Sequence, residues 1–175
     1  ASTSCWTSAT TCSVTCTPER VTKRSADTAA VGAARSLGLQ VTVTQHGRVS
    51  SLAEAAAARG VQPRDIVKTM VVRRAADDYL FVLVPGDSEI AWPKLRALLG
   101  VSRLSMPDAA TALQVTGYER GTITPFGALT ALPVIADSAM AGHLVSIGAG
   151  AHGVAMSLDA DAMLAALNAT VAEIT

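Results

Sequence analysis

The chain has 175 residues, and half of them are apolar, which is enough for one domain with a full hydrophobic core. Aromatic residues make up only 3%, so this core has to be built from Ala, Val, Leu and Ile. The formal net charge is zero, which argues against a general nucleic-acid binder, because such a protein needs a wide basic surface.

The charges are unevenly distributed along the chain. Residues 1–74 hold ten Lys/Arg and four Asp/Glu, whereas residues 75–175 hold four and ten. One face could therefore contact an anion. No apolar run reaches the roughly 18 residues of a membrane span, no signal peptide is recognisable, and no cysteine follows Val21. We therefore expect a cytoplasmic protein without a membrane partner.

Residues 1–20 differ from the remainder, residues 21–175, which we expect to form the single domain. The segment is rich in Ser and Thr, holds all three cysteines, and has no period of 2 or 3.6 with an apolar face. This pattern indicates a tail of uncertain order. The alternative, a metal site at Cys5, Cys12 and Cys16, is disfavoured because no His lies nearby and the spacing matches no standard site.

Capping and turn signals divide the domain into short elements. Ser51-Leu-Ala-Glu54 is a capping box that opens an Ala-rich helix, and Gly60 closes this helix. Such signals predict helices at 25–37, 51–60, 93–100, 107–115 and 159–168, and strands at 41–45, 66–73, 79–84, 101–105, 132–136, 143–147, 154–158 and, as an edge strand, 170–174. Hairpins and helices alternate without a regular βαβ rhythm, so we expect an α+β fold around a mostly antiparallel or mixed sheet.

Lys68 stands inside a strand, Ile66–Val72, whose other residues are nearly all apolar, as in a central strand. A lysine is costly there unless it is paired or lines a cavity. Lys68 is therefore a candidate functional residue, and the alternative is an edge lysine whose ammonium reaches water. Thr69 follows it and should point to the opposite face of the strand.

Residues Gly117–Gly127 read G-Y-E-R-G-T-I-T-P-F-G and predict a shaped loop, because Gly permits positive φ and Pro fixes φ. Its backbone N–H groups could hold a carbonyl, carboxylate or phosphate oxygen, although a purely structural turn explains the glycines equally well. The candidate residues for this binding are Gly121, Thr122, Ile123, Thr124 and Pro125.

A second glycine-rich turn begins after an apolar strand. The small residues Gly148, Ala149 and Gly150 predict close approach to a ligand or to another part of the backbone. His152 could act as a base, but a lone loop histidine is more often solvated. Asp87 and Asp137 could line a pocket or cap turns. The domain has no motif for a nucleophilic Ser or Cys and none for zinc, so we predict no metal and no cofactor.

Taken together, these segments resemble the YbaK-type aminoacyl-tRNA deacylases, which are related to the editing domain of bacterial prolyl-tRNA synthetases. The similarity runs from about residue 25 to 175 and rests on I-V-K-T-M-V-V (66–72), V-P-G-D (84–87), T-G-Y-E-R-G-T-I-T-P-F-G (116–127), L-P-V-I-A-D (132–137) and G-A-G-A-H-G (148–153). It implies a curved mixed sheet, forming a partial barrel, with flanking helices.

The resemblance also implies a free-standing hydrolase that cleaves the ester between a wrong amino acid and the 3′ adenosine of a tRNA. Cys-tRNA(Pro) or Ala-tRNA(Pro) would be the substrate, and a prolyl-tRNA synthetase could be a further partner. By similarity, Lys68 would lie near the scissile ester and the Gly121–Pro125 loop would hold the aminoacyl group. Either water or a ribose hydroxyl could attack the ester.

Two departures from the family pattern concern the amino-acid specificity. Thr122 replaces the second Gly that the Cys-tRNA(Pro) deacylases usually carry, and Gly153-Val154-Ala155 replaces a frequent Gly-Leu-Asp. The missing carboxylate favours an alternative, a non-hydrolytic module that binds the aminoacyl group or the tRNA end, while the retained Lys68 opposes it. A hydrolase of small esters or amides on the same scaffold is a third possibility.

Overall fold

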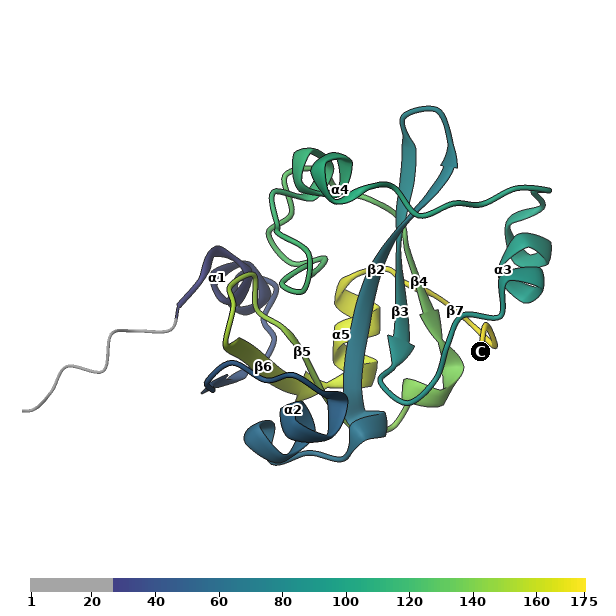
Figure 1. Ribbon diagram of the computed structural model, residues 1–175. Helices are drawn as coiled ribbons and strands as arrows, with labels where there is room; N and C mark the ends of the chain where they lie inside the picture. Colours follow the sequence, from purple (N-terminus) through teal and green to yellow (C-terminus); the bar gives the residue numbers. More distant parts are fainter. Residues whose placement is uncertain (1–26) are drawn as a thin grey trace, which may run out of the picture.

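The computed structural model describes residues 27–175, and the predicted tail of residues 1–20 lies outside this part of the chain. Figure 1 shows the arrangement of its helices and strands. In chain order the elements are α1 (Ala29–Ser36), β1 (Thr42–Gln45), α2 (Leu52–Arg59), β2 (Ile66–Ala75), β3 (Asp78–Pro85), α3 (Trp92–Leu99), α4 (Ala109–Thr116), β4 (Val134–Asp137), β5 (Leu144–Gly148), β6 (Val154–Asp159), α5 (Ala160–Ala166) and β7 (Thr170–Ala172), with short 3₁₀ helices at Pro63–Asp65 and Ser138–Met140.

The strands form one mixed sheet in the order β1-β6-β5-β2-β3-β4-β7. The pairs β2–β3, β5–β6 and β1–β6 are antiparallel, and β2–β5, β3–β4 and β4–β7 are parallel. The predicted α+β class, the mixed sheet and the central position of β2 are confirmed. Within residues 27–175 the edge strands β1 and β7 do not pair with each other, so the sheet stays open rather than closing into a barrel.

Helices cover both faces of the sheet (Figure 1). The larger core contains Val31 of α1 and Met163 of α5, which belong to the same cluster as Val71, Phe81 and Ile147 of the sheet. On the other face, α3 contributes Leu95 to a smaller core with Val72 and Val82. The described helices have at most eight residues, so none of them could cross a bilayer.

The predicted caps of the helix at 51–60 are confirmed with one change. The Ser51 hydroxyl accepts from the Glu54 N–H at 3.1 Å, and Gly60 ends α2 with φ of +69°. The Glu54 carboxylate, however, accepts from the N–H and hydroxyl of Ser50, both at 2.8 Å, rather than from Ser51. The Glu54 side chain therefore binds the residue before the cap instead of the cap residue itself.

The predicted strand at 101–105 is wrong. This segment is the link between α3 and α4, and it crosses the β2–β3 hairpin instead of running alongside it (Figure 1). Only one residue pair comes into register: Arg73 N–H donates to Ser105 O at 2.7 Å, and Ser105 N–H donates to Arg73 O at 3.1 Å. A segment that crosses a strand cannot form a ladder, whatever its propensity.

Asp137, a candidate for a pocket residue, holds the last residues of the chain instead. Its side chain is buried and accepts from the backbone N–H groups of Ala139 (2.8 Å), Ile174 (2.9 Å) and Thr175 (2.9 Å). Burial by itself raises the pKa of Asp137, but these hydrogen bonds to the charged form outweigh burial and leave the pKa lowered. The carboxylate thus fixes the end of β4 to the segment that follows β7.

We expect Asp137→Asn to lower the free energy of unfolding by about 1–3 kcal/mol at pH 7, because an amide cannot accept all of these bonds. Since the folded-state pKa is lowered, the contribution of Asp137 is complete above the ordinary pKa of about 4 and is lost as the pH falls through the folded-state value. Urea denaturation from pH 7 to pH 2 measures this loss.

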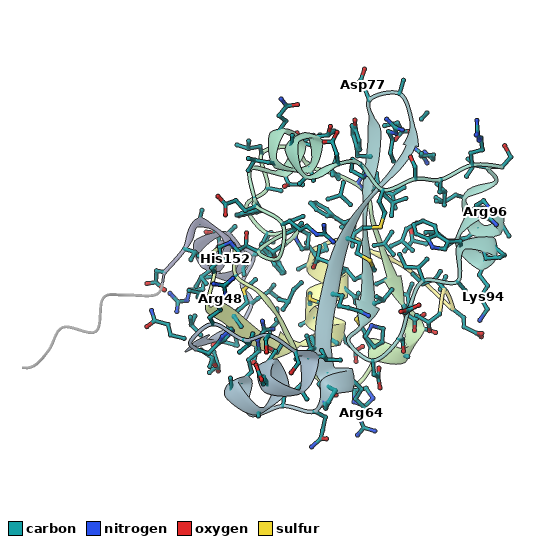
Figure 2. The ribbon with its side chains drawn as sticks, viewed as in Figure 1. Arg48, Arg64, Asp77, Lys94, Arg96 and His152 are labelled. Atoms are coloured by element: carbon teal, nitrogen blue, oxygen red, sulfur yellow. The ribbon has the colours of Figure 1, made fainter. Side chains whose placement is uncertain are left out.

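Asp77→Asn is the matched control, because Asp77 lies exposed at the tip of the β2–β3 hairpin (Figure 2). It removes the same charge without touching a buried hydrogen bond. A stability gap between Asp137→Asn and wild type that stays constant down to pH 2 would contradict this account.

Candidate functional site

The main candidate site is a cavity of about 600 Å³ along one edge of β2. The wall on the sheet side is the run Ile66–Val71, and the opposite wall comes from the start of α4 and from the two glycine-rich loops. The lining residues are Arg59, Ile66, Val67, Lys68, Thr69, Met70, Val71, Met106, Pro107, Asp108, Ala109, Ala112, Arg120, Gly121, Ile123 and Gly148.

The cavity exists because β5 is shorter than β2. β5 ends at Gly148 and pairs with β2 only at Ile66 and Val67, whereas β3 pairs with the other edge of β2 almost throughout. Arg73 directs its N–H and C=O to Ser105, away from β3. By strand alternation, Val71 and Thr69 direct their backbone N–H and C=O groups to the same edge, and thus toward the cavity.

Lys68 and Thr69 both line this cavity although they point to opposite faces of β2. Lys68 shares its face with Met70 and Val72, and Thr69 shares the other face with Val67 and Val71. The alternation predicted for Thr69 is therefore confirmed. A cavity at the edge of a strand can be reached from either face, which brings the two side chains to one site.

The side chain of Lys68 is half-buried, and its ammonium donates to the backbone carbonyl of Ser88 in the turn after β3. This bond holds the charge and leaves two N–H groups of the ammonium for another acceptor. The Thr69 hydroxyl is buried and has no hydrogen-bond partner among the described residues. Both side chains thus have bonding capacity to spare at the cavity.

The loop Gly117–Gly127 is closed by its own hydrogen bonds. The Tyr118 hydroxyl donates to Phe126 O at 2.7 Å, and the Thr122 N–H and hydroxyl both donate to Glu119 O, at 3.0 and 2.9 Å. Burial raises the pKa of Tyr118, which keeps it a donor. Gly121, with φ of +91°, supplies the left-handed conformation that the turn requires.

The loop residues predicted to bind a ligand fall into two groups. Gly121 and Ile123 line the cavity. Thr122 and Thr124 are buried, and neither they nor Pro125 line it, so their contribution is to the shape of the loop. The Thr124 hydroxyl has no partner among the described residues, and we have no physical account of it.

The second glycine-rich turn packs against this loop. A Cβ on Gly148 would lie 3.6 Å from the carbonyl oxygens of both Thr122 and Ile123, and Gly148 also lines the cavity. Ala149 is buried, and its carbonyl accepts from the Thr28 hydroxyl. Gly150 faces the Tyr118 ring so closely that a Cβ would come within 2.6 Å of it. Close approach to another part of the backbone is therefore confirmed at Gly148, whereas the close neighbour of Gly150 is the Tyr118 side chain.

None of the three histidines lines the cavity. His152 Nε2 lies 3.1 Å from Glu119 Oε2, and both side chains are exposed on the outer side of the two loops. His46 and His143 contact Arg59 and Asp65. Asp87 belongs to a separate cavity of about 200 Å³. In the part of the chain that the structure describes, no three His, Cys, Asp or Glu side chains are grouped to hold a metal.

Sequence reasoning missed three charged residues of the cavity: Arg59, Asp108 and Arg120. Arg59 ends α2, and burial lowers its pKa. Asp108 caps α4, where the hydrogen bond from the Thr111 N–H lowers its pKa. Arg120 stands inside the glycine-rich loop and could have been noticed there, whereas nothing in the sequence connects Arg59 to this site.

The polar groups of the lining are suited to binding oxygen atoms. Three cations, Arg59, Lys68 and Arg120, face one carboxylate, Asp108, so the local field favours an anion or a polarised carbonyl. The free backbone edge of β2 adds donors and acceptors at fixed positions. Among the described residues of the wall, Thr69 carries the one hydroxyl, and none is Ser, Cys or His. The geometry therefore suits positioning and polarisation of a bound group.

Comparison with known proteins agrees with this geometry. The family described as "Aminoacyl-tRNA editing domain" matches residues 46–166, which include the whole lining of the cavity. A relative in Enterococcus faecalis, described as "Putative Cys-tRNA(Pro)/Cys-tRNA(Cys) deacylase EbsC", is 28% identical over 117 residues, which cover 66% of this chain and 71% of that protein.

Other relatives are larger. A proline–tRNA ligase of Bacillus licheniformis is 30% identical over 92 residues, which are 53% of this chain but 16% of the ligase. The chain thus corresponds to a small part of the ligases that it matches. Among solved structures, a "putative trans-editing enzyme for prolyl tRNA synthetase" has a TM-score of 0.75 and 26% identity, with 82% of this chain and 92% of that one covered.

The contact of Gly150 with Tyr118 generates a prediction about stability. Gly150 and Gly38 have almost the same φ, +78° and +80°, but a Cβ on Gly38 would meet nothing within 4 Å. Both Gly→Ala changes incur the strain of positive φ, about 1 kcal/mol, and only Gly150→Ala also displaces the Tyr118 ring.

We therefore expect Gly150→Ala to lower the free energy of unfolding by about 1–3 kcal/mol more than Gly38→Ala in urea denaturation. Equal losses in the two variants would show that Tyr118 does not hold the two loops together.

Proposed function

The chain belongs to the aminoacyl-tRNA editing domain family, and on this basis we propose that it hydrolyses the ester bond between a wrongly attached amino acid and its tRNA. The observation that carries the proposal is the cavity at the open edge of β2. There, Lys68, a free strand edge and the Gly121–Ile123 backbone surround a space large enough for an aminoacyl group and the nucleoside that bears it.

In this proposal the chain orients and polarises the ester. The Lys68 ammonium, held by the Ser88 carbonyl, directs its remaining N–H groups to the oxygens of the ester or of the terminal ribose. The N–H groups of Gly121 and Ile123 donate to no partner within residues 27–175 and serve as further donors. Negative charge that develops on the carbonyl oxygen is then met by groups already in place.

The attacking group comes from outside the protein, either a bound water or the neighbouring ribose hydroxyl. Within residues 27–175 the cavity wall holds no Ser, Cys or His, and the Thr69 hydroxyl has no hydrogen-bond partner that could activate it. Holding the nucleophile and the ester together in one site supplies the remaining acceleration.

We further propose that the amino acid is selected by size and that Ala-tRNA(Pro) and Cys-tRNA(Pro) are the substrates. The names of the relatives support tRNA(Pro), and a proline–tRNA ligase is accordingly the partner that we propose. The cavity wall is mostly small or apolar. Ala155, where the resembling deacylases often carry Asp, lies on β6 opposite Gly148 and offers no group to recognise a thiol.

A second candidate function is binding without hydrolysis. It is favoured by the same residue, Ala155, because a carboxylate at this register position would stand next to the cavity wall at Gly148. Such a module would use the same cavity and would retain aminoacyl-tRNA without releasing the amino acid.

Deacylation of charged tRNA(Pro) tests these proposals. We expect the release of alanine and cysteine at rates within about tenfold of each other, because one small group changes binding in an apolar pocket by only about 1–3 kcal/mol. Selection by size predicts that prolyl-tRNA(Pro) is spared, because the proline ring is bulkier than the alanine and cysteine side chains. Binding of all three without hydrolysis would establish the module instead, and rapid loss of proline would refute selection by size.

Lys68→Ala should reduce the deacylation rate at least about 100-fold, as expected for the removal of a charge that stabilises the transition state. Because Lys68 lines a cavity and carries no ion pair within residues 27–175, the melting temperature should change little. Lys94→Ala is the control: it removes an exposed lysine from α3 and should leave the rate unchanged. A folded Lys68→Ala protein with wild-type activity would remove Lys68 from the mechanism.

A further inference from the structure

A second cavity, of about 480 Å³, adjoins the candidate active site. It is lined by Arg73, Arg74, Ala75, Ala76, Arg103, Leu104 and Ser105. The same two chain segments form both cavities: β2 passes from Ile66–Val71 into Arg73–Ala76, and the α3–α4 link passes from Arg103–Ser105 into Met106. Since a strand rises about 3.3 Å per residue, the walls at Val71 and Arg73 are only about 7 Å apart.

The second cavity is positively charged. Three of its seven described lining residues are arginines, and none of the seven is acidic. Arg73 Nε donates to the Ser105 hydroxyl at 3.2 Å, which orients its guanidinium. Asp108, whose pKa is lowered mainly by the hydrogen bond from the Thr111 N–H, is also within reach of the Arg73 charge. Arg103 is exposed and makes no ion pair with residues 27–175, whereas Arg74 is bound to Asp78 by two hydrogen bonds of 2.7 and 3.1 Å. Arg73 and Arg103 thus carry most of the available charge.

The two cavities are neighbours along β2. Within residues 27–175 their walls hold six basic residues and one acidic residue, Asp108, although the net charge of the whole chain is zero. The basic residues are Arg59, Lys68, Arg73, Arg74, Arg103 and Arg120. Such a concentration on an otherwise balanced surface fits a ligand that carries several negative charges in a row.

We propose that Arg73 and Arg103, with Arg74 beside them, bind phosphates of the RNA strand that leads into the active site. This inference rests on the proposed function, which places the terminal aminoacylated nucleoside in the first cavity. The RNA strand then has to leave the first cavity along β2 or along another wall. The second cavity is the adjoining space whose walls carry guanidinium groups. Guanidinium groups match phosphate oxygens in geometry and charge, and they read no base sequence.

Binding of uncharged tRNA tests the proposal independently of hydrolysis. The variant is Arg73→Ala/Arg103→Ala. The control is Arg48→Ala/Arg64→Ala, which removes the same charge from exposed positions far from the hairpin tip that Asp77 marks (Figure 2). We expect the Arg73/Arg103 variant to bind about tenfold more weakly at moderate salt and the control to bind as wild type does.

The salt dependence gives a second measure. Loss of two phosphate contacts with a single strand should reduce the slope of log K against log salt concentration by about 1.4. Equal affinity losses in the two double variants, or a slope that does not change, would overturn the proposal. A tRNA trimmed of its unpaired 3′ nucleotides should bind the Arg73/Arg103 variant and the control equally. A persistent difference would place the arginine contacts elsewhere on the tRNA and would equally overturn the proposal.

A substrate without the preceding phosphates separates this proposal from the proposed function. An amino acid esterified to adenosine alone should be hydrolysed by the Arg73/Arg103 variant at the wild-type rate, because the second cavity has nothing to bind. A variant that is slower on this ester as well would show that the arginines act on the active site and not on the strand. If the wild-type protein cleaves no charged tRNA, the proposed hydrolase activity is refuted. The binding measurements still decide whether the arginines contact the RNA strand.

Discussion

The unequal length of two neighbouring strands creates the site. β3 satisfies one edge of β2 nearly to its end, but on the other edge β5 stops after Ile66 and Val67. Backbone groups in the middle of a sheet normally have partners, and leaving them without any is costly in a dry interior. Here α4 and the two glycine-rich loops surround the open edge without pairing with it, so a cavity with fixed hydrogen-bonding groups remains.

The cavity keeps its shape because its two loops support each other. Tyr118 spans one loop through its bond to Phe126 O, and its ring lies against Gly150 of the other. Gly148 in turn lies against the carbonyls of Thr122 and Ile123. A side chain at Gly150 would displace the Tyr118 ring, whereas a Cβ at Gly148 would make ordinary contacts with the carbonyls. Gly150 therefore serves the packing of one loop on the other.

Basic side chains are concentrated at the same site. A chain of zero net charge has little general attraction for nucleic acid, but its cations need not be spread evenly. Six of the basic side chains within residues 27–175 line the two cavities, and Asp108 is the one acid among the described lining residues. The proposed binding of only the end of a tRNA needs this local field and not a basic surface overall.

The sequence by itself determined the elements and the kind of residue at the site. Caps at Ser51, Gly60 and Asp159, and the apolar run around Lys68, act locally, so helices, strands and the central position of β2 could be predicted. The resemblance to a known family then supplied the reaction class. The predicted strand at 101–105 is wrong because nothing in its residues indicates that the segment crosses the hairpin instead of following it.

Only the tertiary structure decided which residues share a wall. Arg59 lies in α2 and Asp108 at the start of α4, about fifty residues apart in the sequence, and nothing local links them to Lys68. Thr122, Thr124 and Ala149 belong to the predicted motifs yet turn away from the cavity, because the loops must bury part of themselves to hold their shape. Local signals fix the conformation of a segment, whereas the place where one strand ends beside another is fixed by the packing of the whole sheet.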